Sequence, residues 1–231
     1  MKKLLLLLVC SVLTVNAFAQ EDIKPKNMAD LSLSVGKGTF SVAASGFRLH
    51  PVALKKKFFL GYGVRYTGFF GSDKQYITAP AEISEGNFFK PQNKLKLDTI
   101  TFPSTQANMV NLNVHLAYAV SKKLLVGFNI DAIGFSFGGE KSGVLQSGGT
   151  LSNVKANVSN FNLLLTGDYD KGSLNSEFYG LYILENGFMI KGGASFIFTE
   201  YTTTQKITSN FNNDQFRNKN LGLMLGVVYA F

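Results

Sequence analysis

Residues 110–120, VNLNVHLAYAV, decide the fold class of this 231-residue chain. Their even positions are large and apolar, and their odd positions are small or polar. Alternation with a period of two is the pattern of a β-strand whose two faces meet different surroundings. The pattern returns at residues 188–198 and 221–231. No segment after the first twenty residues has a helical apolar period over three turns. The chain is therefore predicted to be all-β.

The small face of these strands distinguishes a membrane barrel from a soluble sandwich. A sandwich would expose charged side chains there, but this face carries Gly, Ala, Ser and Asn. Only 16% of the residues are charged, against about 25% in soluble domains. Small residues suit the crowded inside of a narrow barrel whose bulky side chains face lipid. Strands of about ten residues cross a bilayer when tilted. We therefore predict a transmembrane antiparallel up-and-down β-barrel.

Eight strands are predicted, or ten if the apolar segment 161–167 contributes. The connections alternate between short turns (51–57, 121–123 and 185–187) and long loops (71–107, 139–173 and 202–218). Single-chain bacterial barrels have short periplasmic turns, long outer loops and even strand numbers. Both termini are then expected in the periplasm. The predicted strands are 31–36, 39–50, 58–70, 108–120, 124–138, 174–184, 188–201 and 219–231.

The N-terminus has the pattern of a secretory signal peptide. Lys2 and Lys3 precede the apolar run 4–13, and Ala17-Phe18-Ala19 supplies a small-residue cleavage site. We predict a signal peptide at 1–19, cleaved after Ala19, and an outer-membrane barrel domain at 20–231. A membrane anchor would need about 20 apolar residues. A lipoprotein acylated at Cys10 would have bulky Val9 where a small residue is expected.

The composition excludes several classes of site. The chain has two His and one Cys, too few for a Cys/His zinc site. Without the signal peptide, basic residues exceed acidic ones by six, and the excess is scattered rather than clustered. A nucleic-acid-binding protein would show a basic stripe. We expect no metal, no cofactor and no nucleic-acid partner.

The chain resembles the small OmpA/OmpX-type outer-membrane barrels. The resemblance rests on the signal peptide, the alternating strands and the aromatic last residue, and residues 76–82 and 172–177 look like uncharacterised barrels of the Bacteroidota. It implies partners: the outer-membrane insertion machinery, outer-membrane lipids and lipopolysaccharide. The residues that look like the terminal signal read by that machinery are Leu225, Val227, Tyr229 and Phe231.

The predicted lumen collects polar side chains at one height. Arg65 lies seven residues from the start of its strand, Asp131 lies seven from Leu124, and Glu177 lies seven from Leu184. We predict that these three form an ion-pair network joined by Lys191. Buried charges must be paired, because an unpaired one costs several kcal/mol; a plug of ion pairs is favoured over a proton or ion path. Other predicted lumen residues are Asn113, His115, Asn129 and Ser195.

Two motifs resemble functional sites, but the first is interpreted as a chance match and the second as a turn between hairpin arms. Residues 134–138 match G-x-S-x-G, yet a nucleophile elbow needs a helix after the strand, and none is predicted. Their alternation instead implies a bulge near Ala132 and Ile133. Residues 168–172 suggest a calcium loop, but a carboxylate is missing where Gly172 stands. No catalytic residue is therefore assigned.

The function predicted from sequence is a plugged barrel that acts as a surface scaffold for adhesion, envelope integrity or partner docking through loops 71–107 and 139–173. The apolar residues of the first loop suggest a packed cap or contact surface. Residues 139–159 of the second loop are Gly/Ser/Asn-rich and expected to be mobile. The alternatives are a small channel or carrier, a lipid-modifying enzyme, and a secreted lipocalin-like barrel with its large side chains inward.

Overall fold

The computed structural model describes residues 26–53, 57–84, 97–165, 167–184, 186–207 and 213–231. Residues 1–25 fall outside this range, and with them the predicted signal peptide and cleavage site. In the described part of the chain, no helix qualifies as a membrane span by length and hydropathy. The helices α2 (Ala81–Ser84) and η2 (Gly167–Tyr169) are single turns. The strands are β1 (Lys26–Gly36), β2 (Thr39–Ala53), β3 (Phe58–Thr78), β4 (Thr99–Ala119), β5 (Leu124–Phe137), β6 (Lys141–Ser147), β7 (Thr150–Val158), β8 (Phe161–Leu163), β9 (Leu174–Ile183), β10 (Phe188–Ile207) and β11 (Asn213–Ala230).

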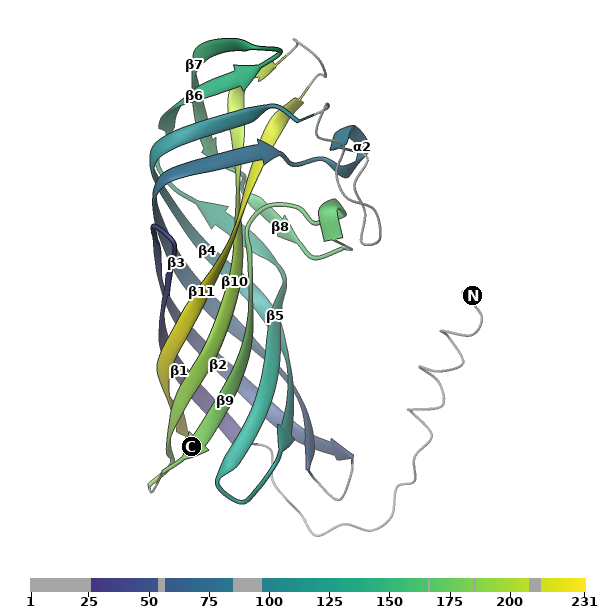
Figure 1. Cartoon of the computed structure of the whole chain (residues 1–231). Coiled ribbons are helices and arrows are strands. Elements are labelled where there is room, and N and C mark those ends of the chain that lie inside the picture. Colours follow the sequence, from purple (N-terminus) through teal and green to yellow (C-terminus); the bar gives the residue numbers. More distant parts are fainter. Residues whose placement is uncertain (1–25, 54–56, 85–96, 166, 185, 208–212) are drawn as a thin grey trace, which may run out of the picture.

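A closed ring forms the body of the molecule (Figure 1). Antiparallel pairing runs β1–β2–β3–β4–β5–β9–β10–β11, and β11 returns to β1. Closure leaves no unpaired edge in this ring, which is the condition for a sheet to lie in lipid. Short turns join the strands at the end that carries the C-terminus, which we call the turn end. In one of them, Asn186 and Gly187 adopt positive φ angles, as a tight hairpin turn requires.

Over the described residues the sheet has eleven strands, where the sequence predicts eight, or ten with segment 161–167. The difference comes from β6, β7 and β8, which lie in the segment interpreted as a loop, 139–173. The composition of that segment indicates mobility, but its Gly/Ser/Asn-rich part pairs as the β6–β7 hairpin. Pairing the predicted strands 108–120 and 124–138 across the short turn 121–123 places Asn113 opposite Asp131 and His115 opposite Asn129, and the structure confirms both pairs. The predicted bulge is confirmed as well, since the β4–β5 register skips Ala132.

A second, smaller ring stands on the first at the opposite end. Here β3 and β4 continue past the predicted strand ends, β4 pairs with β6, and β7 pairs with β10. The pairs Phe216–Thr78 and Arg217–Ile77 join β11 directly to β3 and close a ring of six strands. We call this upper ring the cap. Segments 71–107 and 202–218, predicted as loops, are thus largely strand where the structure describes them, because their apolar residues have a core to pack against.

The facing of side chains reverses between ring and cap in β3 and β4. In the lower ring the even-numbered residues point outward, and Tyr62 and Leu112 are exposed. At Asp73 the backbone takes a φ of 51°, and residues 72 and 73 are both exposed, as are 103 and 104. Beyond that point the even-numbered residues turn inward, and Tyr76 is fully buried. Large apolar side chains therefore face outward in the ring and inward in the cap.

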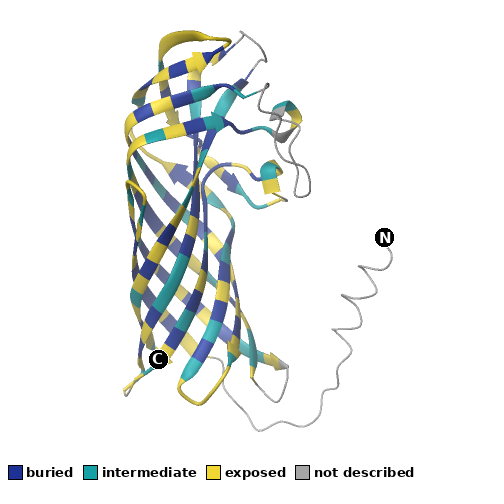
Figure 2. Ribbon diagram, in the orientation of Figure 1, coloured by how far each residue is buried: buried dark blue, intermediate teal, exposed yellow. Residues whose placement is uncertain are grey.

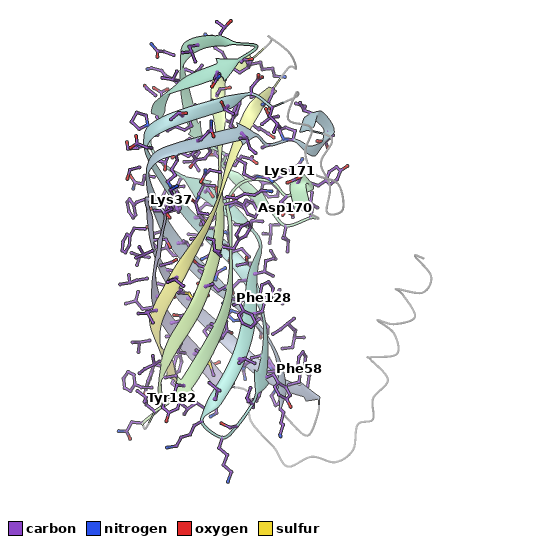
Figure 3. All side chains as sticks on the ribbon, viewed as in Figure 1. Lys37, Phe58, Phe128, Asp170, Lys171 and Tyr182 are labelled. Carbon is purple, nitrogen blue, oxygen red and sulfur yellow. The ribbon has the colours of Figure 1, made fainter. Side chains whose placement is uncertain are left out.

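Burial alternates along the ring strands (Figure 2). Bulky side chains such as Phe128 and Tyr182 project from the wall of the barrel (Figure 3). Inside, an apolar cluster lies at each end of the lumen. The cluster at the turn end contains Met28, Phe47, Leu49, Ala117, Leu125, Tyr179, Leu181, Met189, Met224 and Val228. The cluster in the cap contains Tyr76, Ile100, Phe102, Ala107, Leu145, Ala156, Val158, Tyr201, Ile207 and Phe216.

Candidate functional site

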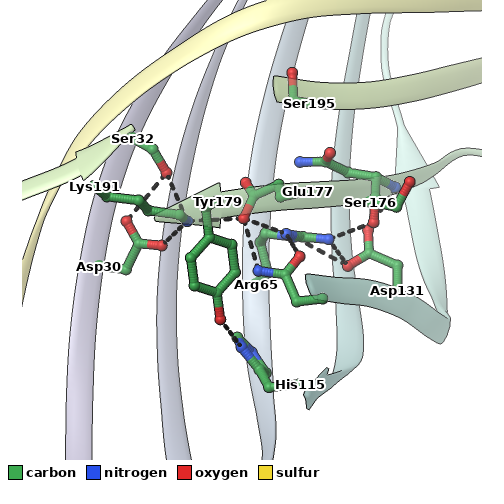
Figure 4. A network of polar contacts seen from close by, with 12 residues as sticks. Asp30, Ser32, Arg65, His115, Asp131, Ser176, Glu177, Tyr179, Lys191 and Ser195 are labelled. Atoms are coloured by element: carbon green, nitrogen blue, oxygen red, sulfur yellow. Dashed lines mark hydrogen bonds and ion pairs between the residues drawn. The ribbon is translucent and has the colours of Figure 1, made fainter. Parts of the chain in front are cut away.

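The charged side chains of the lumen meet in one network of polar contacts (Figure 4). This network lies between the two apolar clusters. Arg65 on β3 is fully buried and donates to Asp131 on β5, with Nη2–Oδ1 at 2.5 Å and Nε–Oδ1 at 3.0 Å. Its Nη1 lies 3.1 Å from Glu177 Oε2 on β9. The structure thus brings together, across the barrel, three residues that lie far apart in the sequence. All three side chains point into the lumen in the alternation of their strands, and they lie at similar heights along the barrel. These two features bring them together.

Lys191 on β10 extends the network to the far wall. Its Nζ lies 2.8 Å from Glu177 Oε2 and also contacts the carboxylate of Asp30 on β1. Sequence reasoning missed Asp30, because the alternation alone starts the first strand at residue 31. A signal is nonetheless present, since Asp30 continues the inward series of Ser32 and Ser34. Among the described residues, the network comprises three carboxylates and two cations.

Neutral donors stabilise the surplus negative charge. Asn129 accepts from Arg65 Nη1 at 2.6 Å and donates to Glu177 Oε2 at 2.7 Å, which links the two charged residues. Asp131 Oδ2 accepts from Asn111 Nδ2 at 2.8 Å and from the backbone N–H of Asn175 at 2.9 Å. Carboxylates satisfied in this way tolerate burial, because each hydrogen bond replaces one that water would make.

Of the other predicted lumen residues, Asn129 belongs to the network, whereas Asn113, His115 and Ser195 are buried but lie outside it. Ser195 Oγ is 2.5 Å from Ser34 Oγ. His115 stacks on Phe47 with ring centroids 4.2 Å apart, and its Nδ1 is 3.5 Å from the Tyr179 hydroxyl. Asn113 makes no side-chain hydrogen bond with any residue that the structure describes. A small void beside Glu177 is too narrow for a water molecule.

The G-x-S-x-G motif lies at the end of β5, with Gly138 just beyond the strand. Ser136 is buried, and its hydroxyl donates to Asn162 Oδ1 at 2.9 Å. Asn162 in turn donates to Asn111 Oδ1, so Ser136 belongs to a polar chain that leads to Asp131. The bonds of Ser136 thus hold β8 on β5.

Segment 164–173, which we call the β8–β9 loop, covers an ion pair on the outside of the wall with its described residues, 164–165 and 167–173. Arg217 and Glu200 are neighbours on β11 and β10, with Nη2–Oε2 at 2.7 Å, and both are buried. Arg217 also donates to the backbone oxygen of Asp170 and lies over the ring of Phe198. Burial raises the pKa of Asp170, opposed by the hydrogen bond from the Leu165 N–H and by the charge of Arg217. Asp168, considered for calcium, pairs with Lys219.

The predicted terminal signal lies on the outer face of β11. Leu225, Val227 and Tyr229 are exposed there, and Phe231 follows the strand. Leu223 and Leu221 continue the same exposed row. The apolar surface extends onto β10, because the rings of Phe188 and Tyr229 contact each other with centroids 4.9 Å apart.

No family model and no curated protein matches the chain. Solved structures are similar at low sequence identity. Neisserial surface protein A has 11% identity and a TM-score of 0.39, with 90% of this chain and 96% of that chain covered. A major outer membrane protein from Thermus thermophilus has 13% identity and a TM-score of 0.39, covering 90% and 100%. Ail, the attachment invasion locus protein of Yersinia pestis, has 8% identity and a TM-score of 0.34, covering 90% and 98%. Membrane placement therefore has to be judged from the surface of this chain.

Proposed function

We propose that the chain is an integral outer-membrane barrel with a plugged lumen, which presents its cap as a contact surface. The observation that carries the membrane placement is the belt of exposed apolar side chains around the lower ring. Leu223 and Leu225 on β11 are 80% and 70% exposed. A soluble protein rarely exposes a continuous apolar patch of more than a few hundred Å². Lipid is the partner that such a closed belt fits.

The plug is supported at three levels of the lumen. Apolar clusters occupy the turn end and the cap, and the ion-pair network lies between them. Eight strands enclose an interior just wide enough for side chains to fill. A path for a solute would have to break paired charges, each costing several kcal/mol when orphaned. This favours a scaffold over the small channel or carrier.

The contact role is supported by the shape of the cap. The β6–β7 hairpin extends the barrel beyond the apolar belt and carries Leu151 near its tip, 67% exposed. Binding residues commonly lie on loops held by a rigid scaffold. The six-strand ring below the hairpin supplies such a scaffold.

Planar-bilayer recordings test the plug. The purified barrel should show no discrete conductance steps, because the lumen is filled at three levels. Steps of porin size would refute the plug and leave the membrane placement intact.

Adhesion of cells that display the barrel tests the contact surface. Cells with the unchanged barrel should adhere to polystyrene more than cells without it, and Leu151→Ser should lower that adhesion. Leu221→Ser is the matched control, because Leu221 on the lower ring is 69% exposed and undergoes the same chemical change. The contact surface would be refuted if Leu151→Ser left adhesion unchanged, or if Leu221→Ser lowered it equally at the same surface level of protein. Neither result would bear on the plug.

A further inference from the structure

An apolar cavity opens at the turn end of the barrel. Its volume is about 250 Å³, and it lies inside the ring next to the short turns. A barrel mouth that meets water would ordinarily carry polar side chains, because apolar surface left in contact with water is unfavourable. An apolar mouth therefore needs an occupant. The apolar lining comes from seven different strands and includes Met28, Leu49, Phe59, Ala119, Leu125 and Met189.

Two lysines stand at the rim of this cavity. Lys26 begins β1 and Lys122 lies in the turn between β4 and β5, and both are exposed. Neither forms an ion pair with a residue that the structure describes. Apolar walls beside two cations complement a molecule with an apolar tail and an anionic head.

The cavity is closed at its inner end. Phe47, Tyr179 and Leu181 belong to the same apolar cluster as the cavity walls and are buried. The network of Arg65, Glu177 and Lys191 lies beyond them. A molecule that enters the mouth therefore stays there rather than passing through.

We propose that this cavity binds a single-chain carboxylate amphiphile, a fatty acid, with its chain among the apolar walls and its carboxylate at Lys26 and Lys122. A volume of about 250 Å³ is below the roughly 300–1,000 Å³ of drug-sized sites, so one chain fits and two do not. Met28 and Met189 adapt their shape to a flexible chain, since Met is unbranched. Tyr118, Tyr182 and Tyr229 are exposed near the turn end. Tyr is enriched at the membrane interface, which a membrane amphiphile can reach.

Photolabelling tests the site directly. Residues 20–231 are folded into phospholipid nanodiscs and exposed to dodecanoate carrying a terminal diazirine, and adducts are mapped by peptide mass spectrometry. We expect saturable labelling on the strands that carry Met28 and Met189, competed by dodecanoate and not by dodecanol. Labelling of the lipid-facing residues should be non-saturable. Absence of a saturable adduct, or equal competition by dodecanol, would overturn the proposal. So would a saturable adduct that forms only after residues 20–25 are deleted, because the chain itself would then fill the mouth.

Three kinds of variant locate the site. Neutralising Lys26 and Lys122 with Gln should raise the half-saturating concentration about fivefold per lysine. Lys123→Gln removes the same charge from the same turn without lining the cavity and should change nothing. Ala119→Phe fills the cavity and should abolish saturable labelling. Heat-modifiable migration on gels checks that each variant is folded. Unchanged labelling of the folded Ala119→Phe protein, or an equal effect of Lys123→Gln, would contradict the assignment.

Discussion

Replacement of Arg65 by Met should destabilise the barrel more than any single surface change. Arg65 is fully buried and makes ion pairs with both Asp131 and Glu177. Without Arg65, Glu177 still forms its ion pair with Lys191, whose Nζ lies 2.8 Å from Glu177 Oε2. Asp131 keeps only neutral donors among the described residues, Asn111 and the Asn175 backbone N–H. The variant therefore leaves one buried carboxylate without a cation.

The expected loss follows from that single orphaned charge. Removing one partner of a buried ion pair costs about 3–5 kcal/mol, or roughly 150- to 5,000-fold in the folding equilibrium constant. Replacing both partners by apolar side chains of similar volume removes the orphan. Arg65→Met combined with Asp131→Leu should therefore recover part of the loss, with a coupling energy of about 2–3 kcal/mol.

The assay is a urea titration of the barrel folded into lipid vesicles. The chain contains no Trp, so the folded fraction is measured from the migration of unheated samples on gels. Arg48→Met is the matched control, because Arg48 lies exposed on the outer face of β2. It should change the unfolding free energy by no more than about 0.5 kcal/mol. An Arg65→Met barrel within about 1 kcal/mol of wild type, or an absent coupling energy, would refute the account of the plug.

Three further outcomes are expected. Burial raises the pKa of Asp170 in the folded chain, so the contribution of this carboxyl to stability is greatest below its unfolded pKa and falls as pH rises through its folded pKa. Asp170→Asn should therefore equal or exceed wild type in urea resistance at neutral pH. An advantage of the variant over wild type that grows in acid would contradict this. Arg217→Gln leaves Glu200 buried without its cation. Trypsin should then cleave the β8–β9 loop several-fold faster than in wild type. An unchanged cleavage rate would argue against a role for the ion pair in holding the loop. Gly127→Ala places a Cβ 2.6 Å from the ring of Tyr179 and should lower the unfolding free energy by about 1–3 kcal/mol through overpacking. The loss should be smaller in a Tyr179→Leu background, and an equal loss in both backgrounds would contradict the contact.

Much of the ring could be predicted because alternation fixes both facing and register. A one-residue slip would turn every bulky side chain inward, so the pairs of Asn113 with Asp131 and His115 with Asn129 follow from the pattern and one short turn. Matching heights then place Arg65 near Asp131. The place of Asp30 in the network was not predicted, because the end of a strand is set by the strands it pairs with. β1 continues along β2 and β11 beyond the alternating segment.

The cap could not be predicted for a different reason. The alternation of β3 and β4 continues past residue 71 but changes facing at Asp73, where the backbone takes a positive φ. From sequence, Tyr76 and Phe102 indicate a packed cap or a contact surface without saying which strands enclose it. Pairing of β7 with β10 and of β11 with β3 joins segments far apart in the chain. Such long-range pairing is not encoded in any local period.

Spin labels at two neighbouring positions of β11 test the central claim, that bulky side chains face lipid and the lumen is filled. Residues 20–231 contain no Cys, so Leu223→Cys and Met224→Cys each give a single site. Leu223 is 80% exposed and Met224 is 2% exposed. In lipid vesicles, the label at 223 should collide freely with oxygen dissolved in the bilayer, and the label at 224 should be shielded from oxygen and from a water-soluble nickel reagent. A shielded label at 223, or ready access of the nickel reagent to 224, would contradict the account.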